Sequence, residues 1–268
     1  MTTFGDRLAE AVERRRSQLV LGLDPHAAAT SDDAERVCCD LIELVAPACV
    51  AAKLQMACFE RHGAAGWTAF ERVAEAAADA GLLVIADAKR GDIGLTSEAY
   101  AAALLRPPID AMTVSPMMGG DAVAPFVDAA ARSGRGLFAL VRTSNPGAAD
   151  LQDRPLADGR PWHEALAALV AEWGRPTVGA SGLAAVGAVV GATVPERLAR
   201  LRELMPAQPF LVPGVGAQGG RAADLGPAFG GRPAGAIVAA SRSIAEADDP
   251  LAAARDLRAA IWRASGAS

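Results

Sequence analysis

The chain has 268 residues, of which 51% are apolar and 21% are charged, and its formal net charge is −5. This composition excludes a disordered chain, and the length suits one (α/β) barrel or two ordinary domains. The acidic balance and the lack of a basic stripe argue against nucleic-acid binding. The first residues carry no apolar signal core, and no run of about 18 apolar residues follows, so we expect no membrane partner and a cytoplasmic location.

Short apolar runs of strand type alternate with alanine-rich helical stretches along the chain. A first helix starts near Thr3, where Asp6 completes a capping box, and its far end, Arg14–Arg16, is expected to be solvated. Ser31 is the expected N-cap of the next helix, and Gly81 marks the end of a third. Residues 195–205 carry leucines on one helical face. The predicted strands cover residues 18–24, 49–55, 82–89, 110–116, 137–144, 176–181, 210–216 and 236–243.

Eight strand–helix units in about 250 residues predict an α/β fold closed into a (β/α)8 TIM barrel. The early strands are almost continuously apolar, as expected for parallel strands that are covered on both faces. No linker or change of composition divides the chain, so we expect residues 1–268 to form a single domain. An open, doubly wound sheet is the alternative architecture.

Charged residues gather where the predicted strands end, which is the edge at which barrels of this kind hold their chemistry. Asp87 and Lys89 are two residues apart on one strand, and this spacing places both side chains on the same face. Lys53 would join them from the neighbouring strand, and adjacent opposite charges keep each other ionised. The pattern therefore predicts a charged pocket at the barrel mouth. A salt-bridge network that only plugs the barrel is the alternative.

The glycine-rich segment PGVGAQGG, residues 213–220, follows the seventh predicted strand, and Arg242 follows the eighth. The loops after these two strands are the usual phosphate site of the fold, and an arginine can bind a phosphate in bidentate fashion. We therefore expect a phosphate-bearing ligand, with the loop 214–220 closing over it.

No metal or cofactor site is expected. The histidines and cysteines share no ligand spacing, so we interpret the former as surface or loop residues and the latter as small apolar residues in a reducing cytosol. No G-x-S-x-G nucleophile frame and no pyridoxal or thiamine motif occurs. The histidines are His26, His62 and His163, and the cysteines are Cys38, Cys39, Cys49 and Cys58.

The segment DAKRGDI, residues 87–93, resembles the D-x-K-x-x-D signature of the orotidine 5′-phosphate decarboxylase family. Further segments that resemble the family follow in its order, and two of them are similar to its longer bacterial subfamily, type 2. Ser115 and the pair Met117–Met118 depart from that pattern, which leaves the pyrimidine contacts near strand four open. The similar segments are GLDP (22–25), KLQ (53–55), TVSPMMGG (113–120), RTSNPGA (142–148), PGVGAQGG (213–220) and SRSI (241–244).

The resemblance implies cofactor-independent decarboxylation of orotidine 5′-phosphate to uridine 5′-phosphate, the last step of UMP synthesis. It implies that Lys89 protonates C6, beside Asp87 and Lys53, in a Lys-Asp-Lys-Asp network completed by Asp92. It also implies a homodimer in which Asp92 and Thr96 reach the partner's site. The substrate-binding roles implied are ribose binding by Asp24, pyrimidine recognition by Ser144, and phosphate binding by Gln218 and Arg242.

Three other functions fit part of the pattern. A Schiff-base aldolase also uses a barrel lysine and a phosphate site, although the acids around Lys89 favour its charged form. A metal-dependent sugar-phosphate decarboxylase would share the signature. An inactive nucleotide-binding barrel would keep the ion cluster without turnover.

Overall fold

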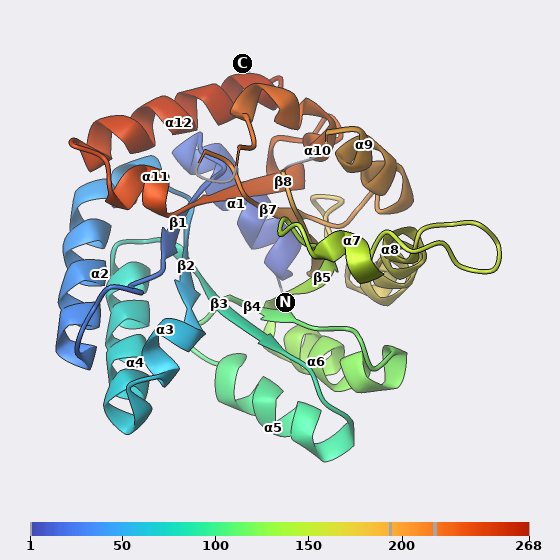
Figure 1. Ribbon diagram of the computed structural model, residues 1–268, viewed down its shortest axis with the longest axis horizontal. Helices are drawn as coiled ribbons and strands as arrows, with labels where there is room; N and C mark the ends of the chain where they lie inside the picture. Colours follow the sequence, from blue (N-terminus) through green and yellow to red (C-terminus); the bar gives the residue numbers. More distant parts are fainter. Residues whose placement is uncertain (1, 193–194, 217–218, 268) are drawn as a thin grey trace.

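The computed structural model describes residues 2–192, 195–216 and 219–267. Its eight strands pair in parallel, each with the next along the chain and the last with the first, and so form a closed barrel. The helices surround this barrel (Figure 1). The expected (β/α)8 barrel is therefore confirmed over the open sheet. The strands are β1 (Leu19–Leu23), β2 (Ala51–Gln55), β3 (Leu83–Arg90), β4 (Ala111–Val114), β5 (Gly136–Arg142), β6 (Val186–Val190), β7 (Phe210–Pro213) and β8 (Ala236–Ala240).

The longer helices lie between successive strands, except that α1 precedes the first strand and α12 follows the last. Short 3-10 turns and helices of four or five residues fill the remaining connections. The helices are α1 (Phe4–Arg15), α2 (Ser31–Val45), α3 (Met56–Glu60), α4 (Gly63–Asp79), α5 (Gly94–Leu104), α6 (Gly120–Ser133), α7 (Ala148–Leu151), α8 (Trp162–Gly174), α9 (Pro195–Leu204), α10 (Gly226–Phe229), α11 (Arg242–Ala245) and α12 (Pro250–Ala264). The 3-10 turns are η1 (Ala46–Ala48), η2 (Arg175–Thr177), η3 (Ala222–Leu225) and η4 (Pro233–Gly235). No helix in the described ranges is long and apolar enough to span a bilayer.

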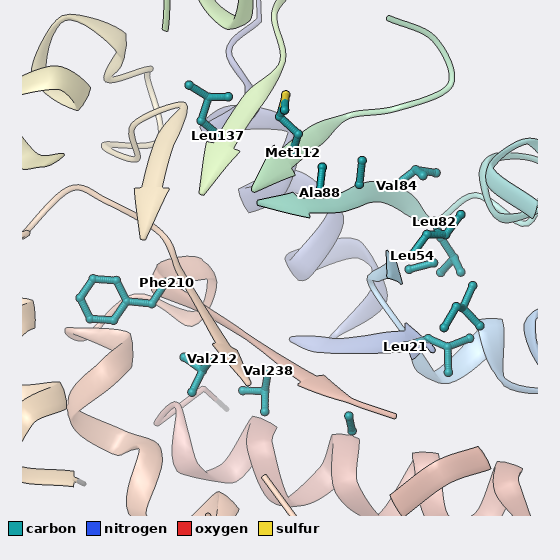
Figure 2. Close-up of a cluster of buried hydrophobic side chains, with 14 of the residues drawn as sticks. Leu21, Leu54, Leu82, Val84, Ala88, Met112, Leu137, Phe210, Val212 and Val238 are labelled. Atoms are coloured by element: carbon teal, nitrogen blue, oxygen red, sulfur yellow. The ribbon is translucent and has the colours of Figure 1, made fainter. Parts of the chain in front are cut away.

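Successive side chains of each strand point alternately outward to the helices and inward to the barrel axis. The outward side chains, among them Leu54, Val84 and Met112, belong to the larger core (Figure 2). This core also includes residues of the covering helices, such as Val73 and Phe126. The inward side chains form a second core, which includes Ile85 and Phe138. The barrel is thus packed on both faces of its sheet.

Helix α1 closes the amino-terminal end of the barrel. Its Phe4 ring meets the Phe138 ring edge-on, with centroids 5.9 Å apart. A Cβ atom at Gly136 would lie 2.3 Å from the Phe4 ring, so β5 must begin with a residue that has no side chain. This end is filled mainly with apolar groups, whereas the inward-pointing charged residues Lys53 and Asp87 lie toward the opposite, carboxyl end.

The predicted sixth strand, 176–181, is wrong. Residues 175–177 form the 3-10 turn η2, and Val178 makes only an isolated antiparallel bridge with Ala184. The true strand, β6, is Val186–Val190, and all five of its residues are buried. It pairs with β5 and β7, whereas Pro176 and Val178 are exposed and Pro176 lacks a donor for a sheet.

The helix ends follow the sequence closely, with two differences. Thr3 and Asp6 form the expected capping box, and Gly81, at φ +72°, follows the end of α4. The N-cap of α2 is Thr30 rather than Ser31, because the Thr30 hydroxyl accepts the Asp33 N–H at 3.1 Å. Arg15 is not simply solvated, since its guanidinium donates to four backbone carbonyls of the chain segments that precede β2 and β3.

Candidate active site

The pleat of three neighbouring strands turns polar side chains inward above the apolar plug. On β2, Ala51 points into the inner core and Lys53 follows two residues later; on β3, Ile85 is followed by Asp87 in the same way. Side chains on one face of a strand recur every second residue. The inner face of β2 and of β3 therefore changes from an apolar to a charged side chain over two residues. The site therefore sits at the carboxyl end of the barrel, as expected.

Asp87 is the centre of this group. Its Oδ2 accepts from Lys53 Nζ at 2.8 Å and from Gln55 Nε2 at 3.3 Å. Its Oδ1 accepts from Lys89 Nζ at 2.6 Å and from the Thr113 hydroxyl at 2.9 Å. Four donors from three strands thus hold both carboxylate oxygens in place.

Lys89 reaches Asp87 from a bent strand end. Its backbone is left-handed, with φ +48°, and the pairing of β3 with β4 shifts register between Ala86 and Arg90. The Lys89 N–H donates to the Thr113 hydroxyl at 2.9 Å, which fixes the bend. The two-residue spacing correctly predicted the contact between Lys89 and Asp87, but the bulge in β3 sets the position of the Lys89 side chain. As a result, 43% of the Lys89 side chain is exposed, against 8% for Lys53.

The charges in the group depend on one another. Burial opposes ionisation of Lys53, but the carboxylates of Asp87 and Asp24 outweigh it and raise the pKa of this lysine. Burial likewise opposes ionisation of Asp87, but the ammonium groups of Lys53 and Lys89 lower the pKa of its carboxyl group to about 2. Lys53 also lies 3.5 Å from Asp24 Oδ1. Within one chain, the alternating row is therefore Asp24, Lys53, Asp87 and Lys89.

The lowered pKa of Asp87 makes stability depend on pH. A carboxyl group whose pKa is lower in the folded state stabilises that state above its unfolded pKa of about 4, and this contribution is lost as pH falls toward about 2. We expect Asp87→Asn to lower the free energy of unfolding at pH 7 by roughly 2 kcal/mol, because it leaves Lys53 without a buried counter-ion. Denaturant titrations at several pH values should show this difference shrinking below pH 4. A difference that stays constant down to about pH 2.5 would contradict the assignment.

A cavity of about 440 Å³ opens above the charged group. Lys53, Asp87 and Lys89 lie at one side of its lining, and Ser144 comes from the β5 end. The lining also includes Arg242 and residues 213–215 after β7, where we expected a phosphate site. The Arg242 residue is exposed, and its side chain makes no hydrogen bond or ion pair with the described residues, so its guanidinium is free to bind an anion.

The sequence matches the family model described as "Orotidine 5'-phosphate decarboxylase / HUMPS family" over residues 17–257. The chain belongs to this family.

Relatives of known name cover almost the whole chain. A Roseiflexus castenholzii protein named orotidine 5'-phosphate decarboxylase is 43% identical, over 96% of this chain and 97% of its own. One of the same name from Rhodopirellula baltica is 42% identical, over 91% of this chain and 88% of its own. The solved structure of Leishmania donovani OMP decarboxylase aligns with a TM-score of 0.88 and 38% identity, covering 99% of this chain and all of the other.

Most residues that the decarboxylase-family resemblance singled out come together in this cavity, and some do not. Among the described residues, Asp24, Lys53, Asp87, Lys89, Ser144 and Arg242 all line it. Asp92 precedes α5 and Thr96 lies in its first turn, and neither lines the cavity of its own chain. The Asp92 carboxylate instead accepts the N–H of Ile93 at 2.8 Å. Gln218 lies outside the described residues.

Two polar contacts of the site were not expected from the sequence. Thr113 bonds both the Asp87 carboxylate and the Lys89 backbone, and Gln55 bonds Asp87. The signal was present, because Gln55 is two residues beyond Lys53 and Thr113 two beyond the inward-facing Ala111. No group of His, Cys, Asp and Glu in the described part of the chain is arranged to hold a metal ion. His163, expected near the surface, is buried.

Proposed function

We propose that this protein decarboxylates orotidine 5′-phosphate to uridine 5′-phosphate and CO2 without a cofactor. The observation that carries the proposal is the Lys53–Asp87–Lys89 group, in which Lys53 and Asp87 are buried and which shares one cavity with the unpaired Arg242 side chain. Curated relatives named for this activity are similar over nearly the full length of the chain. A volume of about 440 Å³ is within the range of pockets for small ligands.

The reaction breaks the bond between C6 and the carboxylate carbon and leaves the electron pair on C6. Since the pyrimidine offers no conventional electron sink at this carbon, the protein must stabilise the negative charge itself. The Lys89 ammonium, held at 2.6 Å from Asp87, supplies a fixed positive charge and then donates a proton to C6. CO2 leaves, and water reprotonates the neutral amine. Asp87 and Lys53 keep the ammonium in position.

The lysine content supports this role. Lys53 and Lys89 are the two lysines of the chain, in which arginine supplies every other basic side chain apart from histidine. Arginine does not release a proton near neutral pH, whereas lysine can. We infer that position 89 requires a lysine because the reaction consumes its proton.

The remaining residues hold the substrate. Asp24 binds the ribose hydroxyls, Ser144 the pyrimidine amide edge, and Arg242, with Gln218, the 5′-phosphate. A homodimer completes the site, with Asp92 and Thr96 entering the partner's cavity. The exposure of Ile93 and Leu95, at 60% and 82%, supports this, because these apolar side chains closely follow Asp92 in the chain.

The direct test is the loss of orotidine 5′-phosphate absorbance on adding purified, chelator-treated protein. Turnover at an undiminished rate in chelator supports the proposal. Activity that depends on added divalent metal would favour a metal-dependent sugar-phosphate enzyme of the same family. Trapping of a covalent adduct by borohydride would favour an aldolase, and nucleotide binding without turnover an inactive barrel.

Arg242→Ala should lower kcat/KM by about 10²-fold or more, with a higher KM, because binding of the remote phosphate contributes to catalysis. Steady-state kinetics with orotidine 5′-phosphate measure this. Arg263→Ala, on the distant helix α12, is the matched control and should leave both constants unchanged. If Arg242→Ala leaves kcat/KM within about threefold of the wild type, Arg242 does not bind the phosphate.

A further inference from the structure

The chain between β5 and α8 forms one wall of the cavity and then leaves the barrel. Thr143, Ser144 and Asn145 line the cavity directly after β5. The chain then passes through α7 and projects outward before α8 begins (Figure 1). Residues on so long a connection are poorly positioned unless something ties the connection down.

Asp153, just beyond α7, anchors this connection to the barrel and its helices through ion pairs. Arg142, the last residue of β5, donates to both of its carboxylate oxygens, at 2.9 and 3.0 Å. Arg197 of α9 lies 3.0 Å from Oδ2, and His163 Nδ1 of α8 lies 3.2 Å from Oδ1. Side chains from three separate elements thus converge on one carboxylate that is largely buried.

Gln152 connects this point to the cavity wall. Its side-chain oxygen accepts the Thr143 N–H at 2.8 Å, and its amide nitrogen donates to the Thr143 hydroxyl at 3.0 Å. His163 Nδ1 lies 2.7 Å from the Gln152 carbonyl. Both neighbours of this nitrogen are acceptors, so Nδ1 carries the proton. The hydrogen bonds between Thr143 and Gln152 therefore join the two ends of the loop 143–152.

The opposite side of Ser144 contacts Gly191, the residue that follows β6. A Cβ atom at Gly191 would lie 2.8 Å from Ser144 Cα and 2.9 Å from its Cβ, and the Gly191 N–H donates to the Arg142 carbonyl at 2.8 Å. Ser144 is thus seated on a residue without a side chain and held from behind by the loop. Any shift of the loop would change where its hydroxyl meets the substrate.

We propose that Asp153 is a positioning residue, which fixes Ser144 against the substrate through Arg142 and Gln152. This inference rests on the proposed function, because it assigns Asp153 a part in binding the pyrimidine. Asp153, Arg142 and Gln152 do not line the cavity, so Asp153 acts on the substrate only through Thr143 and Ser144, which do.

Two variants test the role. Asp153→Ala removes the carboxylate, and Gly191→Ala displaces Ser144 from the other side. Each should raise KM for orotidine 5′-phosphate by about tenfold or more while kcat changes less than about threefold, since a misplaced wall weakens substrate binding. A merely structural role would lower the fraction of folded enzyme, and therefore kcat, at unchanged KM. Asp158→Ala is the matched control, because Asp158 is an exposed acid of the same β5–α8 connection and its ion pair among the described residues is with Arg160.

A double-mutant cycle with Ser144→Ala shows whether Asp153 acts through Ser144. In the Ser144→Ala background, Asp153→Ala should raise KM by less than about twofold, because the contact it positions is already gone. An equal rise in both backgrounds, or a wild-type KM in Asp153→Ala alone, would overturn the proposal.

Amide hydrogen exchange separates this inference from the function it rests on. Asp153→Ala should exchange amides in residues 143–152 at least about tenfold faster than Asp158→Ala and the wild type. If the wild type shows no turnover, the proposed function fails, and equal exchange in the three proteins would then also overturn the role of Asp153.

Discussion

Replacing Lys89 with alanine is expected to lower kcat by at least about 10⁴-fold, because in the proposed mechanism this one change removes both the charge that stabilises the C6 carbanion and the proton that neutralises it. The side chain lies at the cavity surface and pairs with Asp87, which is itself held by Lys53 and Thr113. The rest of the site should therefore keep its shape. Binding of uridine 5′-phosphate, measured by calorimetry, should stay within about tenfold of the wild type.

Lys89→Arg separates the two roles of the ammonium. Arginine keeps the positive charge and can pair with Asp87, but it does not release a proton at neutral pH. If proton donation is essential, this variant is as inactive as Lys89→Ala. Activity of either variant within about tenfold of the wild type would remove Lys89 from the proton-donor role.

Much of the site could be predicted because it depends on local spacing. The two-residue period of a strand predicts that Lys53, Asp87 and Lys89 share a face. The inner face of these strands is apolar toward the amino end of the barrel and polar toward the carboxyl end. Their place at the carboxyl end follows from the barrel itself. The left-handed backbone of Lys89 could not be predicted, because a bulge depends on the register with the next strand.

Other features depend on contacts between distant segments, which no spacing records. Strand β6 was missed because Val186–Val190 lies in an alanine- and glycine-rich stretch, and only its burial between β5 and β7 distinguishes it as a strand. The side chains that contact the Asp153 carboxylate belong to β5, α8 and α9. Taken singly along the sequence, none of these residues indicates a shared site.

Mixing two inactive variants is expected to restore activity if Asp92 completes the partner's site. Asp92 lies outside the cavity of its own chain, next to the exposed Ile93 and Leu95. In a two-fold symmetric dimer of Lys89→Ala with Asp92→Ala, one cavity carries both changes, and the other combines an intact Lys89 with the partner's intact Asp92. Random exchange of subunits makes half of the dimers mixed, so about one quarter of the wild-type activity should return.

The chain offers a matched control for this mixture. Lys53 and Lys89 lie in one cavity of the same chain, 2.8 and 2.6 Å from Asp87. A mixed dimer of Lys53→Ala with Lys89→Ala therefore has one damaged lysine in each cavity and should recover nothing. Subunit exchange is verified by isolating mixed dimers with two different affinity tags before the rate is measured. If the verified Lys89→Ala and Asp92→Ala dimers are as inactive as this control, Asp92 does not act across the interface, and each cavity is built from a single chain.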